Sequence, residues 1–247
     1  MGAIWTVLCT AVAVCAALAV GPAMAGELKI SGNVALTTNY VARGVSQSES
    51  SAAIQGGLDL DWNGPYAGAW GSSIDFTDLG LAASMELDLY GGWRATLGPV
   101  ALNLGFIYYA YPNADEDALG AGEMDYFELY AKGAVSPAPG LTLQGAIAYS
   151  PEFTFEMEKA TYVEGSAGYA LTPRLTLAAT VGHQTIEDVT GVFDSLVAPF
   201  APTRKADYTS WNAGATYGAF GLEFDLRWHA TDIDDTSPII EELFALK

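Results

Sequence analysis

The chain has 247 residues, about half of them apolar, and is rich in glycine (27) and tyrosine (13). This composition excludes an intrinsically disordered chain and is typical of an all-β domain. The formal net charge of −19 also disfavours nucleic acid as a partner, because so acidic a protein is repelled by a phosphate backbone.

The first 25 residues are expected to form a cleavable signal peptide. An apolar run covers 4–20, and the Ala-Met-Ala sequence at 23–25 supplies a small-x-small cleavage site. The mature domain would then be 26–247. Residues 2–8 contain no Lys or Arg, which departs from the usual signal, so an uncleaved membrane anchor is the alternative.

Both cysteines, Cys9 and Cys15, lie in this segment, so the mature chain would contain none. An exported protein without disulfides needs another source of stability, and closing a sheet is one. After the signal, no segment approaches 18 consecutive apolar residues, so no transmembrane helix is expected.

Apolar and polar residues alternate over stretches of about ten residues, which predicts a single antiparallel transmembrane β-barrel. One of the clearest stretches is 100–111, where Leu104 lies on the apolar face and Asn103 on the other. We expect about twelve strands, at 29–40, 52–62, 66–76, 85–95, 100–111, 125–134, 141–150, 160–170, 175–184, 207–217, 222–231 and 239–246.

The last of these strands is the least regular. Barrels of this kind usually end on an aromatic residue, whereas here Phe244 is followed by three more residues. The segment 239–246 could equally form a short helix, and its recognition by the barrel assembly machinery is an open question.

Short and long connections alternate along the chain. Short turns rich in Gly and Pro fall at 63–65, 96–99, 135–140, 171–174 and 218–221. Longer links fall at 41–51, 77–84, 112–124, 151–159, 185–206 and 232–238. Outer-membrane barrels have short periplasmic turns and longer extracellular loops, so this alternation favours that class over a soluble sandwich.

Aromatic residues cluster near the predicted strand ends, as expected for two membrane interfaces. Those near the short turns are Trp62, Tyr66, Trp93, Tyr169 and Tyr217, and those near the long links are Tyr40, Phe76, Tyr108, Tyr149 and Trp228. Aromatic residues at the strand ends of a soluble barrel are the alternative.

If the apolar face meets lipid, the charged residues of the opposite face line the lumen. They are Asp59, Asp61, Asp75, Glu86, Asp88, Arg94, Glu128, Lys132, Glu164, Glu223, Asp225 and Arg227. Nine acids against three bases predict a negative interior that favours cations, although these charges could also pair with one another. Small residues expected on the same face, such as Ala67, Ala69, Gly71 and Ser73, favour a narrow passage over a plugged barrel.

Arg43 follows the first predicted strand and is expected at the pore mouth. There it would bind a carboxylate or phosphate group, or else pair with a loop acid.

An enzyme is not expected. A four-residue turn at 218–221 would place Ser210 opposite His229, but no orienting third group or oxyanion hole is evident, so we interpret the pair as structural. The sequence contains no phosphate-binding glycine loop and no metal-ligand cluster, and therefore neither a cofactor nor a metal is expected.

Three stretches carry a family resemblance: TTNYVARGVSQSESSAAIQGGLDL (37–60), YAGAWGSSIDF (66–76) and MELDLYGGW (85–93). In order and spacing they resemble the TorF-like porins, which are also known as a conserved hypothetical family. The resemblance implies an outer-membrane barrel of a Gram-negative bacterium, taken to be a channel.

The function expected from these features is passive diffusion of small hydrophilic solutes, with cations preferred. Expected partners are outer-membrane lipids, the diffusing solutes and the barrel assembly machinery. The alternatives are a non-conducting structural or binding barrel and a soluble lipocalin-like binder.

Overall fold

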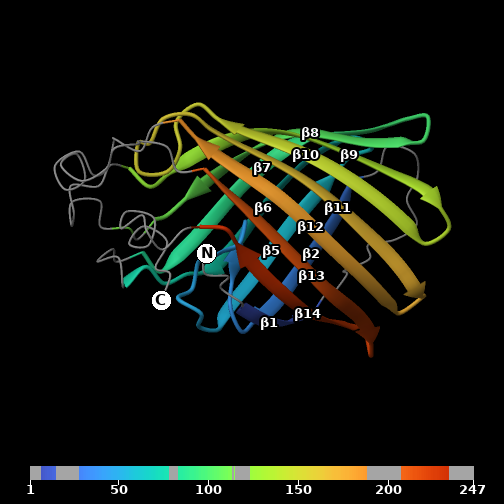
Figure 1. Cartoon of the computed structure of the whole chain (residues 1–247). Coiled ribbons are helices and arrows are strands. Elements are labelled where there is room, and N and C mark those ends of the chain that lie inside the picture. Colours follow the sequence, from blue (N-terminus) through green and yellow to red (C-terminus); the bar gives the residue numbers. More distant parts are fainter. Residues whose placement is uncertain are drawn as a thin grey trace.

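Twelve strands close into one antiparallel barrel in the computed structural model (Figure 1). The structure describes residues 7–14, 28–77, 83–112, 114, 123–187 and 207–233. The barrel strands are β1 (Val7–Val14), β2 (Lys29–Thr37), β5 (Ala53–Asp61), β6 (Pro65–Ser73), β7 (Met85–Leu97), β8 (Val100–Ala110), β9 (Tyr126–Ala138), β10 (Leu141–Ser150), β11 (Ala160–Thr172), β12 (Leu175–Ile186), β13 (Tyr208–Ala219) and β14 (Leu222–Thr231). Two short strands, β3 (Val41–Ala42) and β4 (Val45–Ser46), pair with each other outside the barrel sheet.

Eleven of the predicted strands are confirmed within a few residues, and each pairs with its neighbours in chain order. The twelfth, 239–246, lies outside the described residues, as does the signal cleavage site. The place between β14 and β2 is held by β1. This strand lies in the segment for which the sequence predicts a signal peptide.

The outside of the barrel is apolar. Residues that alternate along the strands, among them Leu58, Leu89, Leu104, Leu129 and Leu226, have 46–55% of their surface exposed. A continuous exposed apolar surface of this kind is unfavourable in water and is what lipid covers. The fold is therefore that of a membrane-spanning barrel. Among the described residues, no helix is long and apolar enough to cross a membrane.

The expected aromatic belts need correction at three positions. Trp62, Trp93, Tyr169 and Tyr217 are exposed on the outside near the short turns. Tyr40 and Tyr66, by contrast, hydrogen-bond to lumen residues, and Phe76 packs against a buried apolar cluster. Aromatic residues near strand ends thus serve two different environments.

The predicted small-residue face of β6 was also wrong. Tyr66 lies directly opposite Asp61 across the short turn, and residues paired in this way share a face. Because side chains alternate between the two faces of a strand, a shift of the pairing register by one residue exchanges the lumen-facing and outward-facing residues. The lumen therefore receives Tyr66 and Trp70, whereas Ala67 and Ala69 lie on the other face.

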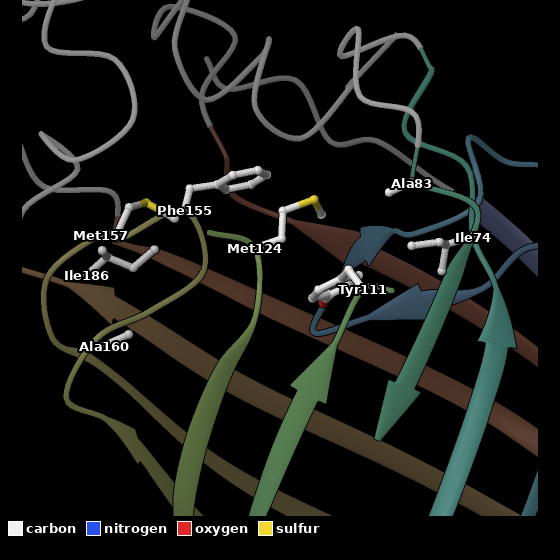
Figure 2. Close-up of a cluster of buried hydrophobic side chains, with 8 residues drawn as sticks. All are labelled: Ile74, Ala83, Tyr111, Met124, Phe155, Met157, Ala160 and Ile186. Atoms are coloured by element: carbon white, nitrogen blue, oxygen red, sulfur yellow. The ribbon is translucent and has the colours of Figure 1, made fainter. Parts of the chain in front are cut away.

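A buried apolar cluster lies where the long links leave the barrel (Figure 2). It stretches across the ends of several strands. Its members are Ile74, Ala83, Tyr111, Met124, Phe155, Met157, Ala160 and Ile186. We call this end of the lumen the outer end and the end with the short turns the inner end. The outer end is thus packed as a core, although the rest of the lumen is polar.

Candidate functional site

The link between β2 and β5 folds into the barrel as the β3–β4 hairpin. Its two turn residues, Arg43 and Gly44, have positive φ angles of 49° and 87°. Positive φ at both central residues is typical of the tight turns that join twisted strands. Gly44 packs so closely that a Cβ would lie 2.6 Å from Cβ of Ser210 and 2.8 Å from Cγ2 of Thr231. The hairpin tip is therefore seated against β13 and β14.

The Arg43 side chain crosses the lumen from this tip. Its Nη1 and Nη2 donate to the two carboxylate oxygens of Glu128 on β9, at 2.8 and 2.6 Å, and Nη1 also donates to Oε1 of Gln184 on β12 at 2.9 Å. The guanidinium lies over the Tyr162 ring of β11, 4.3 Å from its centroid. A two-pronged pair with a buried carboxylate fixes both distance and orientation. Arg43 therefore lies inside the lumen and not at its mouth. Its acidic partner is Glu128, which belongs to a barrel strand and not to a loop.

The base of the hairpin is held by hydroxyl groups. Tyr40 Oη donates to Oε1 of Glu86 at 2.8 Å, and its ring meets the edge of Trp70 with 5.5 Å between centroids. Ser46 and Ser48 both donate to Oδ1 of Asn39. These contacts hold the link 38–52, which lies in the first resembling stretch, as an inward constriction and not as an external loop; the rest of that stretch is the wall strand β5.

Among the described residues, three cavities follow one another along the lumen. The outer cavity has a volume of about 600 Å³, the middle one about 560 Å³ and the inner one about 510 Å³. Arg43 and Tyr109 line both the outer and the middle cavity. Arg94 and Lys132 line both the middle and the inner cavity. The cavities therefore share walls, and the hairpin lies where the first two meet.

The charges are separated along the lumen. Those of the outer cavity are Arg43, Glu49, Asp75, Glu86, Asp88, Asp225 and Arg227. Those of the middle cavity are Arg43, Asp59, Arg94, Glu128, Lys132 and Glu164. Those of the inner cavity are Lys29, Asp61, Arg94 and Lys132. Five acids against two bases at the outer end thus become one acid against three bases at the inner end.

Most of the predicted lumen charges have partners inside the barrel. Arg94 pairs with Asp61 at 2.8 Å, and Arg227 pairs with Asp225 at 2.9 Å. Lys132 lies over the Tyr130 ring, 4.8 Å from its centroid. These contacts account for all three bases that the sequence placed in the lumen.

Two predicted lumen acids lie at the margins. Asp75 follows the end of β6 and bridges to Ser48, while its carboxylate accepts from Thr77. Glu223 is exposed near the turn between β13 and β14. Neither lines the centre of the lumen.

Tyrosine hydroxyls are the functional groups that sequence reasoning missed. Tyr90 donates to Asp59 at 2.8 Å, Tyr109 to Glu128 at 3.2 Å and Tyr162 to Glu164 at 3.2 Å. The alternation of side chains along β8 predicts that Tyr109 faces the lumen, because Tyr109 lies on the same face as Asn103.

The predicted Ser210–His229 neighbours are not opposite each other. β13 and β14 are joined by a two-residue turn and not a four-residue one, so Ser210 pairs with Thr231 and His229 with Asn212. The sequence had placed each partner two residues away, because it overestimated the turn. Among the described residues, no group of three His, Cys, Asp or Glu side chains could hold a metal ion.

Residues 22–240 match the family described as "bacterial protein of unknown function (Gcw_chp)". The chain belongs to this family. A search of curated proteins gives no match.

Several solved outer-membrane proteins align with this Gcw_chp chain at low identity and with TM-scores below 0.5. An outer-membrane channel from Pseudomonas putida F1 is 15% identical with a TM-score of 0.44, and the match covers 93% of this chain and 95% of that one. OmpT of Vibrio cholerae is 9% identical with a TM-score of 0.42, covering 94% and 98%. OprD from Pseudomonas aeruginosa is 11% identical with a TM-score of 0.43; the match covers 82% of this chain but only 64% of the OprD chain.

Proposed function

We propose that this protein is an outer-membrane channel for passive diffusion of small hydrophilic solutes, with a preference for cations. The observation that carries the proposal is the series of three cavities along the lumen, with an inward-folded hairpin where the outer and middle cavities meet. A constriction that is built from one loop and fixed by a charge pair narrows a passage without filling it. The resemblance to TorF-like porins points in the same direction.

The barrel wall supports a lipid setting. The outer surface is apolar and the interior carries charges, whereas a lipocalin-like binder would need an apolar interior and a polar outer surface. We therefore propose the outer membrane of a Gram-negative cell, with membrane lipids and the barrel assembly machinery as partners.

We further propose that residues 1–25 are removed on export. The position of β1 between β14 and β2 would then pass to another strand. The predicted strand 239–246 is the candidate, because it follows β14 in the chain and would run antiparallel to it. N-terminal sequencing of the membrane-fraction protein should then begin at Gly26, and a retained Met1 would contradict cleavage.

The proposed cation preference rests on the outer cavity. Of its five acids, Asp225 pairs with Arg227, while Glu86 accepts only from the tyrosine hydroxyls of Tyr40 and Tyr111 among its described hydrogen bonds. Carboxylates around a narrow passage attract cations, and low-dielectric walls screen them less than open water would.

A non-conducting binding barrel is the second candidate, and one observation favours it. The apolar cluster at the outer end packs like a core, with Met124, Met157 and Ile186 each below 2% exposed. A barrel closed in this way would bind a solute in its outer cavity without passing it through. We propose no catalytic role for any residue.

Single-channel recording in planar bilayers separates the two candidates. The refolded protein should give discrete conductance steps. Arg43→Ala should increase conductance or its fluctuation, because the hairpin loses its bonds to Glu128 and Gln184. Correctly folded parent protein without conductance would overturn the channel and leave the binding barrel.

A further inference from the structure

The outer cavity contains one acid that differs from its neighbours. Asp88 of β7 is only 7% exposed, and among the described residues its Oδ1 has no hydrogen-bond partner. A buried polar atom without a partner is rare and costly. Glu86, two residues earlier, accepts from Tyr40 and Tyr111. Glu128, on β9, accepts from Arg43 and Tyr109.

Aromatic rings flank this carboxylate on both sides. Asp88 lies directly opposite Trp70 on β6 and directly opposite Tyr109 on β8. Residues paired across strands in this way have neighbouring side chains on the same face. All three residues line the outer cavity, so the buried carboxylate with its unpartnered oxygen lies in the cavity wall between an indole and a phenol.

The aromatic surface continues around the cavity wall. Trp70 meets Tyr40 edge-on, Tyr109 stacks on Tyr126 with 4.4 Å between centroids, and Tyr126 meets Phe153 edge-on at 4.8 Å. Towards the outer end the wall is completed by side chains of the apolar cluster, among them Met124 and Phe155, seen in Figure 2. A cavity of about 600 Å³ has the size of a small-molecule site.

We propose that the outer cavity binds small organic cations, with the ammonium or guanidinium group on Asp88 and an apolar or aromatic body against Trp70 and Tyr109. This inference rests on the proposed channel function and names the class of solute that the channel selects. A carboxylate attracts the positive group, and electron-rich ring faces attract the same charge at a second point. An inorganic cation would gain little from the rings, and an anion would be repelled by both Asp88 and Glu86.

The apolar wall also explains why the solute should carry a body as well as a charge. Removal of apolar surface from water contributes roughly 25 cal/mol per Å². A solute with an ammonium group and a phenyl ring would use both features at once, whereas a bare cation would use only the carboxylate.

The test is block of the channel by phenethylammonium, with 2-phenylethanol as the uncharged match. In planar bilayers, phenethylammonium added on the long-loop side should block the parent reversibly, and 2-phenylethanol should block far more weakly. Asp88→Asn should weaken the block about tenfold or more, as expected when a hydrogen bond to a charged group is lost. Trp70→Leu keeps the charge and should weaken the block by a smaller factor.

Asp61→Asn is the matched control. It removes an acid of the same kind from the inner cavity, where it pairs with Arg94, and should leave the block by phenethylammonium unchanged. Heat-modifiable mobility on gels identifies the variants that have folded. Equal block by the charged and uncharged probes, or equal block in parent and Asp88→Asn, would overturn the inference while the channel itself stands.

If the parent does not conduct, the channel proposal fails and the inference is tested separately by calorimetry on the refolded barrel in detergent. Phenethylammonium binding that Asp88→Asn abolishes would then support the site. Absence of binding to the parent would overturn it.

Discussion

At the outer end of the lumen, Glu86 and Asp88 lie among aromatic rings beneath a packed apolar cluster, whereas at the inner end Lys29, Arg94 and Lys132 surround Asp61 in a polar cavity. The same barrel wall therefore carries opposite charge at its two ends. A total count of lumen charges would describe neither end. The comparison teaches that selectivity in this barrel depends on where along the axis a solute meets the charges, with the β3–β4 hairpin as the divide.

The largest effect is expected from removing that divide. Replacing residues 41–46 with a Gly-Gly link should join the outer and middle cavities and raise single-channel conductance severalfold. Twelve-stranded barrels have room for a narrow passage, and the hairpin narrows it further. The measurement is conductance in planar bilayers, with far-ultraviolet circular dichroism to show an intact sheet. Unchanged conductance would mean that the constriction lies elsewhere.

Neutralising the two ends should shift selectivity in opposite directions. Glu86→Gln with Asp88→Asn removes outer charge and should move the reversal potential in a salt gradient toward zero. Arg94→Gln with Lys132→Gln removes inner positive charge and should move it away from zero, in the cation-selective direction. Shifts of the same sign from both pairs would show that the two ends do not act separately.

The packing difference should appear in stability. Met157 is 1% exposed within the outer apolar cluster, and Met157→Ala should lower the free energy of unfolding by about 2–5 kcal/mol through the cavity it leaves. Leu97 is 63% exposed at the inner end, and Leu97→Ala should cost distinctly less. Denaturant titration in detergent, followed by tryptophan fluorescence, compares the two. Equal losses would contradict a core that is confined to the outer end.

The smallest effect concerns the polar residues behind the hairpin tip. Ser210→Ala and His229→Ala should change neither conductance nor envelope phospholipid turnover, because Ser210 faces Thr231 and His229 faces Asn212. A turnover assay on membranes from cells that express each variant checks this. Loss of hydrolytic activity in either variant would restore an enzymatic reading of the site.

Much of this architecture was predictable because it depends on local alternation. The apolar positions of β7 and β8 and the inward acids Glu86 and Asp88 follow from a side-chain period of two. Arg43 was a candidate for a different reason, because it directly follows the first predicted strand within the resembling stretch.

The predictions that were wrong concern features that depend on contacts between residues far apart in the sequence. Phe220 and Gly221 adopt positive φ angles of 57° and 77° and form a two-residue turn between β13 and β14. The pairing register of these two strands therefore differs by two residues from the predicted one. The inward course of 38–52 depends on Glu128 and Gln184, more than eighty residues away in sequence. No local pattern distinguishes a link that folds into a barrel from one that extends away from it.

The zero-current potential of the parent channel in a salt gradient tests the central claim most directly. With low salt on one side of the bilayer and high salt on the other, the potential should have the sign of a cation-preferring pore. The preference should weaken as both concentrations are raised, because salt screens the outer carboxylates. A potential of the opposite sign, or one that does not depend on salt, would contradict a channel whose selectivity is set by Glu86 and Asp88 at its outer end.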